Sequence, residues 1–236
     1  MATPVRINKY LADQKIASRR EADTLIEDKK VKINGKTAVL GQMVGAGDIV
    51  EVVGATKKLT YLAYYKGRGV ITHSPAENEI DIATRLKKDY SITNVSSVGR
   101  LDKDSEGLII LTNDGRITGP LLSPEAGNEK EYEVTVDKPL SAAFKRFMEV
   151  GVEIEGYRTK VAKVTLSERN DKKFNLVITE GKKHQIRRMC AALGYQVQSL
   201  KRVRIMSIEL GDIKPNQYRK LVAVELKQFL NDLGLA

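Results

Sequence analysis

The segment from Gly99 to Gly107, GRLDKDSEG, concentrates charge directly ahead of an apolar run, LIILT. Three acids and two bases fall within these nine residues: Arg100, Asp102, Lys103, Asp104 and Glu106. Such a cluster is compatible with a polar turn, with a calcium loop, or with the mouth of an active site in which Asp102 is the reactive group.

The calcium interpretation fails at the end of the loop. Counted from Asp102, acids occupy positions 1, 3 and 5 and glycine position 6, as in an EF-hand. Position 12 is Asn113, where a bidentate glutamate is needed, and the flanking segments do not predict a pair of helices. We therefore expect no metal site. Asp, Ser and Gly are ordinary turn residues, so the residues alone leave a structural turn and a reactive aspartate open.

Other familiar chemistries lack their motifs. The chain has no Walker A sequence, no dinucleotide-binding fingerprint and no Cys/His cluster with metal-ligand spacing. His73 and His184 are its only histidines, and nothing marks them as parts of a catalytic triad. Cys190 is the only cysteine, which excludes an internal disulfide and fits a reducing cytoplasm. No apolar run is long enough for a membrane span, and the first residues lack a signal-peptide core, so we expect no membrane partner.

The overall charge favours a polyanionic partner. The 236 residues include 40 Lys and Arg against 30 Asp and Glu, a formal charge of +10 and a pI near 9.5. The bases gather in short runs spread along the chain: SRR, KGR, GKKHQIRR and KRVR. Nucleic acid is the first candidate for such a partner.

The first 54 residues predict a separate small module. Ile7, Tyr10 and Leu11 have helical spacing, and Ser18 with Glu21 fits a capping box that starts a second helix ending near Asp28. VKINGK predicts a hairpin that turns at Asn34-Gly35, and GAGDIVEVVG predicts one more strand. Two small helices followed by short strands, with exposed bases, resemble the S4 RNA-binding domain, an αL-like fold that contacts structured RNA.

Residues 55–60 form a polar predicted linker, and residues 61–236 predict one larger domain. TYLAYYK, LIILT, KEYEVTVDK, TKVAKVTLSE, KFNLVITEG and VQSLKRVRIMSIEL predict strands, the last of them long. EIDIATRLKK, LSAAFKRFMEV, HQIRRMCAAL and VAVELKQFLNDL predict helices. The expected fold class is therefore α+β, with a mixed, mainly antiparallel sheet and flanking helices.

Three motifs in this domain resemble those of one enzyme family. GRLDKDSEGLIILTNDG, EKEYEVTVDKPL and EGKKHQIRRMCAALGYQVQSLKRVRI occur in the order and at the intervals found in pseudouridine synthases. The match is to the branch that modifies ribosomal RNA and carries an N-terminal S4 domain, the RsuA, RluB, RluE and RluF group. The RluF type, which acts on 23S rRNA, resembles the chain most.

The resemblance implies a bacterial-type isomerase with three catalytic residues. Asp102 would attack the sugar or base, or abstract a sugar proton; the two routes stay open. Tyr132 would stack on the flipped base, and Arg187 would oppose the Asp102 carboxylate as a bidentate cation. An isomerisation needs no cofactor or metal, so none is expected.

The resemblance also implies RNA contacts along both domains. Expected to bind RNA are Arg6, Lys9, Arg19, Arg20, Lys32, Lys36, Arg100, Lys103, Lys183, His184, Arg188, Arg202 and Arg204. The expected partner is ribosomal RNA, 23S in preference to 16S, with tRNA left open as a second substrate and a monomer as the default state. The alternative is a non-catalytic S4-type protein for RNA binding or ribosome assembly.

One position departs from the family pattern. Where the family reads N-K-P-x-G, this chain has YYKGRGV, in which Lys66 and Gly69 match but Gly67 replaces the proline. The change puts the local rigidity of this support segment in question.

Overall fold

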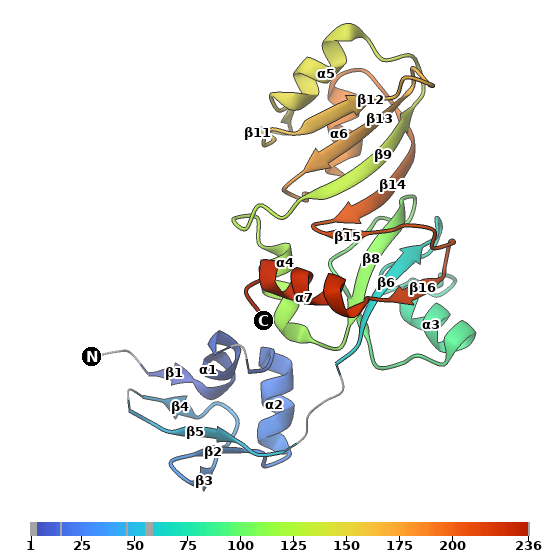
Figure 1. Cartoon of the computed structure of the whole chain (residues 1–236). Helices are drawn as coiled ribbons and strands as arrows, with labels where there is room; N and C mark the ends of the chain where they lie inside the picture. The colour runs from blue at the N-terminus through green and yellow to red at the C-terminus, as the bar shows by residue number, and fades with distance from the viewer. Residues whose placement is uncertain (1–3, 15, 46, 55–58, 236) are drawn as a thin grey trace.

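The computed structural model describes residues 4–14, 16–45, 47–54 and 59–235. Its elongated shape has a small N-terminal module at one end and a long, curved sheet above it (Figure 1). Most of the predicted linker, residues 55–58, lies outside the described residues. Within the described part of the chain, no helix combines the length and apolar character needed to cross a bilayer.

The N-terminal module has the predicted pair of helices and hairpin. Its elements are β1 (Val5–Arg6), α1 (Ile7–Asp13), α2 (Arg19–Glu27), β2 (Val31–Ile33), β3 (Lys36–Thr37), β4 (Met43–Val44) and β5 (Val50–Val52). Ser18 caps α2 by accepting from Glu21 N at 3.3 Å, and Glu21 Oε2 accepts from Ser18 N at 3.0 Å, which confirms the capping box. Asn34 and Gly35 both adopt positive φ between β2 and β3, as a tight hairpin turn requires.

The second domain is built on one mixed sheet of nine strands. The order along the sheet is β12-β13-β9-β14-β8-β6-β16, with β7 and β15 attached at β8 and β14. Only the β14–β8 pair is parallel, which confirms a mixed, mainly antiparallel sheet. The strands are β6 (Tyr61–Lys66), β7 (Ser96–Val98), β8 (Glu106–Thr112), β9 (Lys130–Val136), β10 (Glu153–Ile154), β11 (Tyr157–Arg158), β12 (Lys163–Leu166), β13 (Lys173–Ile178), β14 (Val197–Ile205), β15 (Ile208–Glu209) and β16 (Tyr218–Lys220); β10 and β11 form a separate hairpin.

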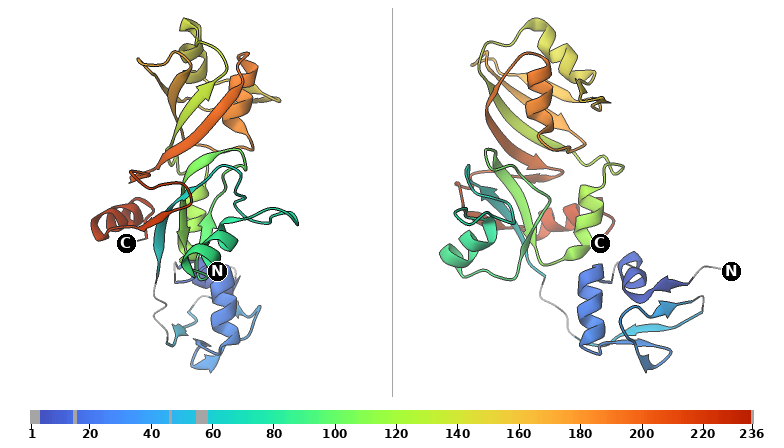
Figure 2. Two further views of the ribbon diagram at one scale, coloured as in Figure 1. Left: turned by 90° about the vertical axis from the view of Figure 1, so that its right-hand side faces the viewer. Right: turned by 180° about the vertical axis from the view of Figure 1, so that it is seen from behind.

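Helices cover one face of one half of the sheet and both faces of the other half (Figure 2). α5 (Ala142–Glu149) and α6 (Gln185–Ala192) pack with β9, β12, β13 and β14 around a core that includes Phe144, Phe174 and Met189. In the other half, α3 (Ile82–Tyr90) packs on one face of β6 and β8, while α4 (Thr118–Leu122) and α7 (Ala223–Asp232) pack on the opposite face; the short helix η1 (Gly115–Ile117) leads into α4. Because both faces of β8 are covered, its LIIL run is continuously apolar instead of alternating.

One predicted element is wrong in its extent. The strand expected over VQSLKRVRIMSIEL ends at Ile205, because Met206 takes positive φ and the chain folds back as β15 against β14. The helix predicted over HQIRRMCAAL is confirmed as α6, and Gly194, at φ +82°, follows its end.

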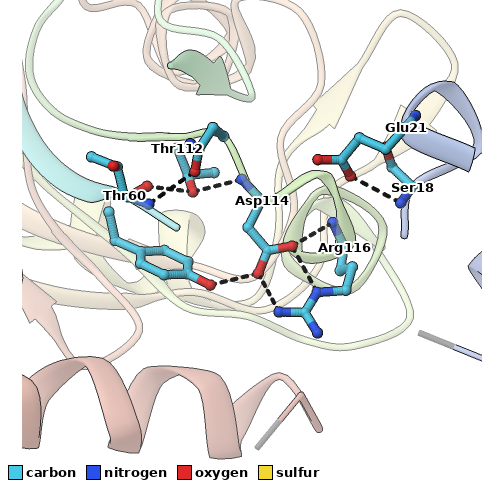
Figure 3. A network of polar contacts seen from close by, with 8 residues as sticks. Ser18, Glu21, Thr60, Thr112, Asp114 and Arg116 are labelled. Atoms are coloured by element: carbon cyan, nitrogen blue, oxygen red, sulfur yellow. Dashed lines mark hydrogen bonds and ion pairs between the residues drawn. The ribbon is translucent and has the colours of Figure 1, made fainter. Parts of the chain in front are cut away.

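The two domains meet where β8 ends. Asp114 accepts from Tyr61 Oη at 2.5 Å and holds Arg116 through both carboxylate oxygens, each at 2.8 Å (Figure 3). Ser18, at the start of α2, lies against Gly115: a Cβ built on this glycine would come 2.5 Å from the Ser18 side chain. A buried charge cluster in the second domain therefore borders the capping box of the N-terminal module.

Candidate active site

The loop that carries Asp102 is fixed by hydrogen bonds to its backbone. Asp102 O accepts from Ser105 N at 3.0 Å, which closes a tight turn. Leu101, just before it, is tied at both ends to Thr72 Oγ1, which accepts from Leu101 N and donates to Leu101 O. The turn expected from the residue types is therefore present, and it presents the Asp102 side chain, 39% exposed, at the edge of a cleft.

Lys66 holds the same loop through hydrogen bonds to backbone carbonyls. Its fully buried ammonium donates to Ser105 O at 2.7 Å, Gly67 O at 3.1 Å and Lys103 O at 3.4 Å. Burial lowers the pKa of Lys66 to about 8, although the nearby carboxylates, that of Asp102 first, work in the opposite direction. The lysine of the support segment thus brings positive charge close to the Asp102 loop.

Asn216 holds the backbone at Gly67, the position where the family pattern has a proline. The Gly67 N–H, which a proline would lack, donates to Asn216 Oδ1 at 3.1 Å. A Cβ at residue 67 would lie 2.7 Å from that same oxygen. The departure from the family pattern is therefore matched by a side chain 149 residues away.

The cleft has a volume of about 900 Å³, within the range of small-molecule and nucleotide sites. The Asp102 loop forms one wall, and the segment from Thr179 to Ile186 forms another. Tyr132, 7% exposed, lines it from β9, as a base-stacking residue would have to. Asp102 and Tyr132 are thus brought to one cavity from positions 30 residues apart.

Arg187 lies near the loop, but its contacts differ from those expected. Its guanidinium donates to Asp104 O and Val197 O, each at 3.1 Å, and to Ser105 Oγ at 3.4 Å. Because these acceptors take up the guanidinium, the described residues contain no ion pair between Arg187 and Asp102, and the predicted bidentate pair is not formed. Arg187 instead ties the turn after Asp102 to the start of β14.

His184 stands close to the Asp102 carboxylate. Its Nε2 lies 3.6 Å from Asp102 Oδ1, and both side chains are partly exposed. The residue adopts φ +53°, immediately before α6 begins at Gln185. The sequence placed His184 among the RNA contacts; the structure places it at the mouth of the cleft.

The other expected RNA contacts have varied surroundings. Arg100 and Lys183 are exposed at the rim of the cleft, and Lys103 forms an ion pair with Glu79 at 2.6 Å. Arg188 is paired with Glu155. In the N-terminal module, exposed side chains belong to Arg6, Lys9, Arg19, Arg20 and Lys36, while Lys32 is partly buried. These positions remain predictions as RNA contacts.

The two arginines of KRVR separate onto opposite faces of β14. Arg204 donates to Glu131 Oε2 at 2.9 Å and Glu129 Oε2 at 3.1 Å, a pairing that argues against the phosphate contact expected of it. Arg202, only 5% exposed, lines the floor of the cleft. Lys130 and Thr72 also line the cleft but were not predicted from the sequence. For Lys130 a signal existed, since it stands two residues before Tyr132 and so shares its strand face.

Comparison with known proteins assigns both domains. Residues 60–192 match the family described as RNA pseudouridylate synthase, and residues 5–50 match the S4 domain. The chain is 40% identical over 231 residues to the dual-specificity RNA pseudouridine synthase RluF of Escherichia coli K12, covering 94% of this chain and 77% of that protein. It is 34% identical to ribosomal large subunit pseudouridine synthase B of Bacillus subtilis, over 94% of both chains.

A solved structure supports the same assignment. A crystal structure of a pseudouridylate synthase superimposes with a TM-score of 0.70 at 28% identity, covering 97% of this chain and 99% of that one. The sequence match, the shared fold and the cleft that joins Asp102 to Tyr132 agree. The chain belongs to the RNA pseudouridine synthase family, as a member with an N-terminal S4 domain.

Proposed function

We propose that this enzyme isomerises a uridine of 23S ribosomal RNA to pseudouridine, with Asp102 as its reactive group. The observation that carries the proposal is the placement of Asp102 on a hydrogen-bonded turn at the edge of a cleft of about 900 Å³, lined also by Tyr132. In the reaction, the bond between uracil N1 and C1′ breaks, the base turns, and C5 bonds to C1′ while the C5 hydrogen leaves as a proton and N1 takes up a proton.

The surroundings of Asp102 suit a group that acts on the sugar. The buried Lys66 ammonium lies behind the loop, where it donates to Ser105 O and brings a positive charge near Asp102. The carboxylate is partly exposed to the cleft and accessible to a substrate. It can attack C1′ as a nucleophile or remove the proton from C2′ to give a glycal.

The target base has to leave the RNA stack to reach this site. Tyr132, fixed in the sheet, offers an aromatic face that replaces part of the lost stacking. Arg187 contributes by holding Asp104 and Ser105, which fixes the turn that presents Asp102. In this role Arg187 is a positioning residue.

The substrate follows from the names of the relatives and from charge. The Bacillus subtilis relative is named for the large ribosomal subunit, and the Escherichia coli relative as dual-specificity. A chain of net charge +10 with exposed bases on its S4 module is suited to a structured RNA. We infer 23S rRNA as the main substrate and tRNA as the second RNA to test.

The test is tritium release from RNA that carries 5-tritiated uridine. Wild type and Asp102→Asn are compared on 23S rRNA, 16S rRNA and tRNA. Release from 23S rRNA by the wild type alone is the expected result. Equal release by both proteins would show that Asp102 is not the reactive group. Release from 16S rRNA alone would contradict the assignment of 23S rRNA as the substrate.

A further inference from the structure

The register of β9 and β14 builds the floor of the cleft. Tyr132 is paired with Arg202, and Leu200 with Val134. A bulge then follows: Arg204 is paired with Glu131, so Val203 is the extra residue on β14. Without the bulge, Arg202 and Arg204 would share a face; with it, Arg202 points to the cleft and Arg204 to the carboxylates on the other side.

Arg202 is a buried charge without a carboxylate partner. Its Nε donates to Leu108 O at 2.7 Å, which fixes the side chain against β8. Its Nη2 is fully buried and has no hydrogen-bond partner, and no ion pair to Arg202 exists among the described residues. A buried, unpaired guanidinium is costly, and a fold keeps one where a ligand supplies the missing acceptor.

A second cation stands beside it. Lys130 comes from the same face of β9 as Tyr132, and its Nζ donates only to Asn128 O, at 3.1 Å. Burial and the positive charge of Arg202 both lower the pKa of Lys130. Two like charges are therefore held together at the floor of the cleft, while the Asp102 carboxylate lies at its edge.

Resting on the proposed function, we propose that Arg202, assisted by Lys130, binds the carbonyl oxygens of the target uracil and stabilises the negative charge that develops there. When the C1′–N1 bond breaks, its electron pair stays with the uracil ring and spreads from N1 to O2 and O4. C1′ bonds to Asp102, or C2′ loses its proton to that carboxylate. The same electron pair later forms the C5–C1′ bond, while the bond from Asp102 to C1′ breaks or, on the glycal route, C2′ regains its proton. The C5 proton then passes to solvent, and N1 takes up a proton.

The placement favours the base over a backbone phosphate. Arg202 is 5% exposed, and it is the residue of β14 that pairs with the proposed stacking residue Tyr132 on β9. A backbone phosphate carries a sugar on either side and therefore needs a more open site. The exposed bases Arg100 and Lys183 at the rim are suited to phosphates. A preorganised donor buried at the floor acts where charge appears during the reaction.

The experiment compares Arg202→Gln with Arg204→Gln, the same change on the opposite face of the same strand. Rates are measured under single turnover with saturating enzyme, on the RNA for which the wild type releases tritium, and the dissociation constant is measured separately. For Arg202→Gln we expect a rate roughly 10²- to 10³-fold lower, as for loss of an oxyanion donor, with binding within about threefold of wild type. Arg204→Gln should keep the wild-type rate.

A substrate with 5-fluorouridine at the target separates chemistry from structure. Fluorine stabilises the uracil anion, so cleavage depends less on the enzyme's cations. The defect of Arg202→Gln, followed as loss of the fluorouridine, should shrink on this RNA. Arg202→Lys keeps a positive charge and serves as a second variant in case Arg202→Gln does not fold. Its single-turnover rate on the uridine substrate should lie between those of wild type and Arg202→Gln.

Three outcomes overturn the inference. Weaker binding with an unchanged saturated rate would assign Arg202 to a ground-state contact such as a phosphate. If Arg202→Gln slows the reaction equally on uridine and fluorouridine substrates, Arg202 has a structural role only. If the saturated rate of Arg202→Gln equals that of the wild type, Arg202 takes no part in the reaction. If Asp102→Asn is inactive while Arg202→Gln is fully active, only this inference fails; if the wild type modifies no RNA, the proposed function fails with it.

Discussion

Gly67 and Asn216 together support the segment beside the Asp102 loop. We expect Gly67→Pro, which restores the family residue, to destabilise the protein by about 1–3 kcal/mol, because the proline removes a hydrogen bond and collides with Asn216. Asn216 has φ +63°, so Asn216→Gly is tolerated by the backbone. In a double-mutant cycle by urea unfolding, Gly67→Pro should cost much less in the Asn216→Gly background. Additive effects would contradict this coupling.

Lys66 should make stability depend on pH. Its pKa is about 8 in the folded protein and 10.5 as a free side chain, so between these values the unfolded chain binds more protons. The free energy of unfolding of the wild type should therefore rise, relative to Lys66→Met, as pH increases from 8 to 10.5. Urea unfolding of both proteins across this range measures the difference, and parallel curves would show that burial does not depress the pKa.

At the level of elements, the contact between β8 and β14 depends on Gly107. This residue has φ +109°, and a Cβ there would lie 2.2 Å from the carbonyl oxygen of Arg202. We expect Gly107→Ala to cost more than about 2 kcal/mol, through backbone strain and steric overlap. Gly119→Ala in α4, where a Cβ meets nothing within 4 Å, is the matched control and should be neutral or stabilising. The stability of both variants is measured from the midpoints of their unfolding curves. A similar loss of stability in both would contradict this explanation.

Helices and strands long enough to show a hydrophobic period could be predicted from the sequence, whereas very short strands and strands interrupted by a bulge could not. The buried β8 run, the alternation of β9 and the Ser18 capping box predicted their elements correctly. The two-residue strands β1, β4, β10 and β11 are too short to carry a period. The reversal at Met206 occurs at a non-glycine residue of positive φ, which no turn motif announces.

The active site followed the same division. The family resemblance gave Asp102 and Tyr132 roles in one reaction, and in the structure both line the same cleft. The contacts of Arg187 could not be predicted, because they depend on carbonyls from two distant segments. The burial of Arg202 depends on the extra residue Val203, and composition alone does not reveal which strand residue is unpaired.

At the scale of the whole molecule, RNA binding should weaken steeply with salt. Each phosphate that is neutralised adds roughly 0.7–0.9 to the slope of log affinity against log salt. Replacing Arg20 and Lys36 by Gln, both exposed on the S4 module, should lower the slope by about 1.4–1.8 if each contacts one phosphate. Arg204→Gln, whose arginine is already paired with Glu129 and Glu131, should leave it unchanged. Filter binding at several salt concentrations measures the slope, and a flat response would exclude this interface.

Gly115 sets how closely the S4 module approaches the catalytic domain, since any side chain there would displace Ser18. If the S4 module binds an RNA stem while Asp102 acts on the target uridine, as the proposed function requires, the separation of the two domains works as a ruler. The enzyme would then select uridines that lie a matching number of base pairs from that stem. Inserting one base pair into that stem would move the uridine along and around the helix, away from the cleft, without altering a single contact at the target base.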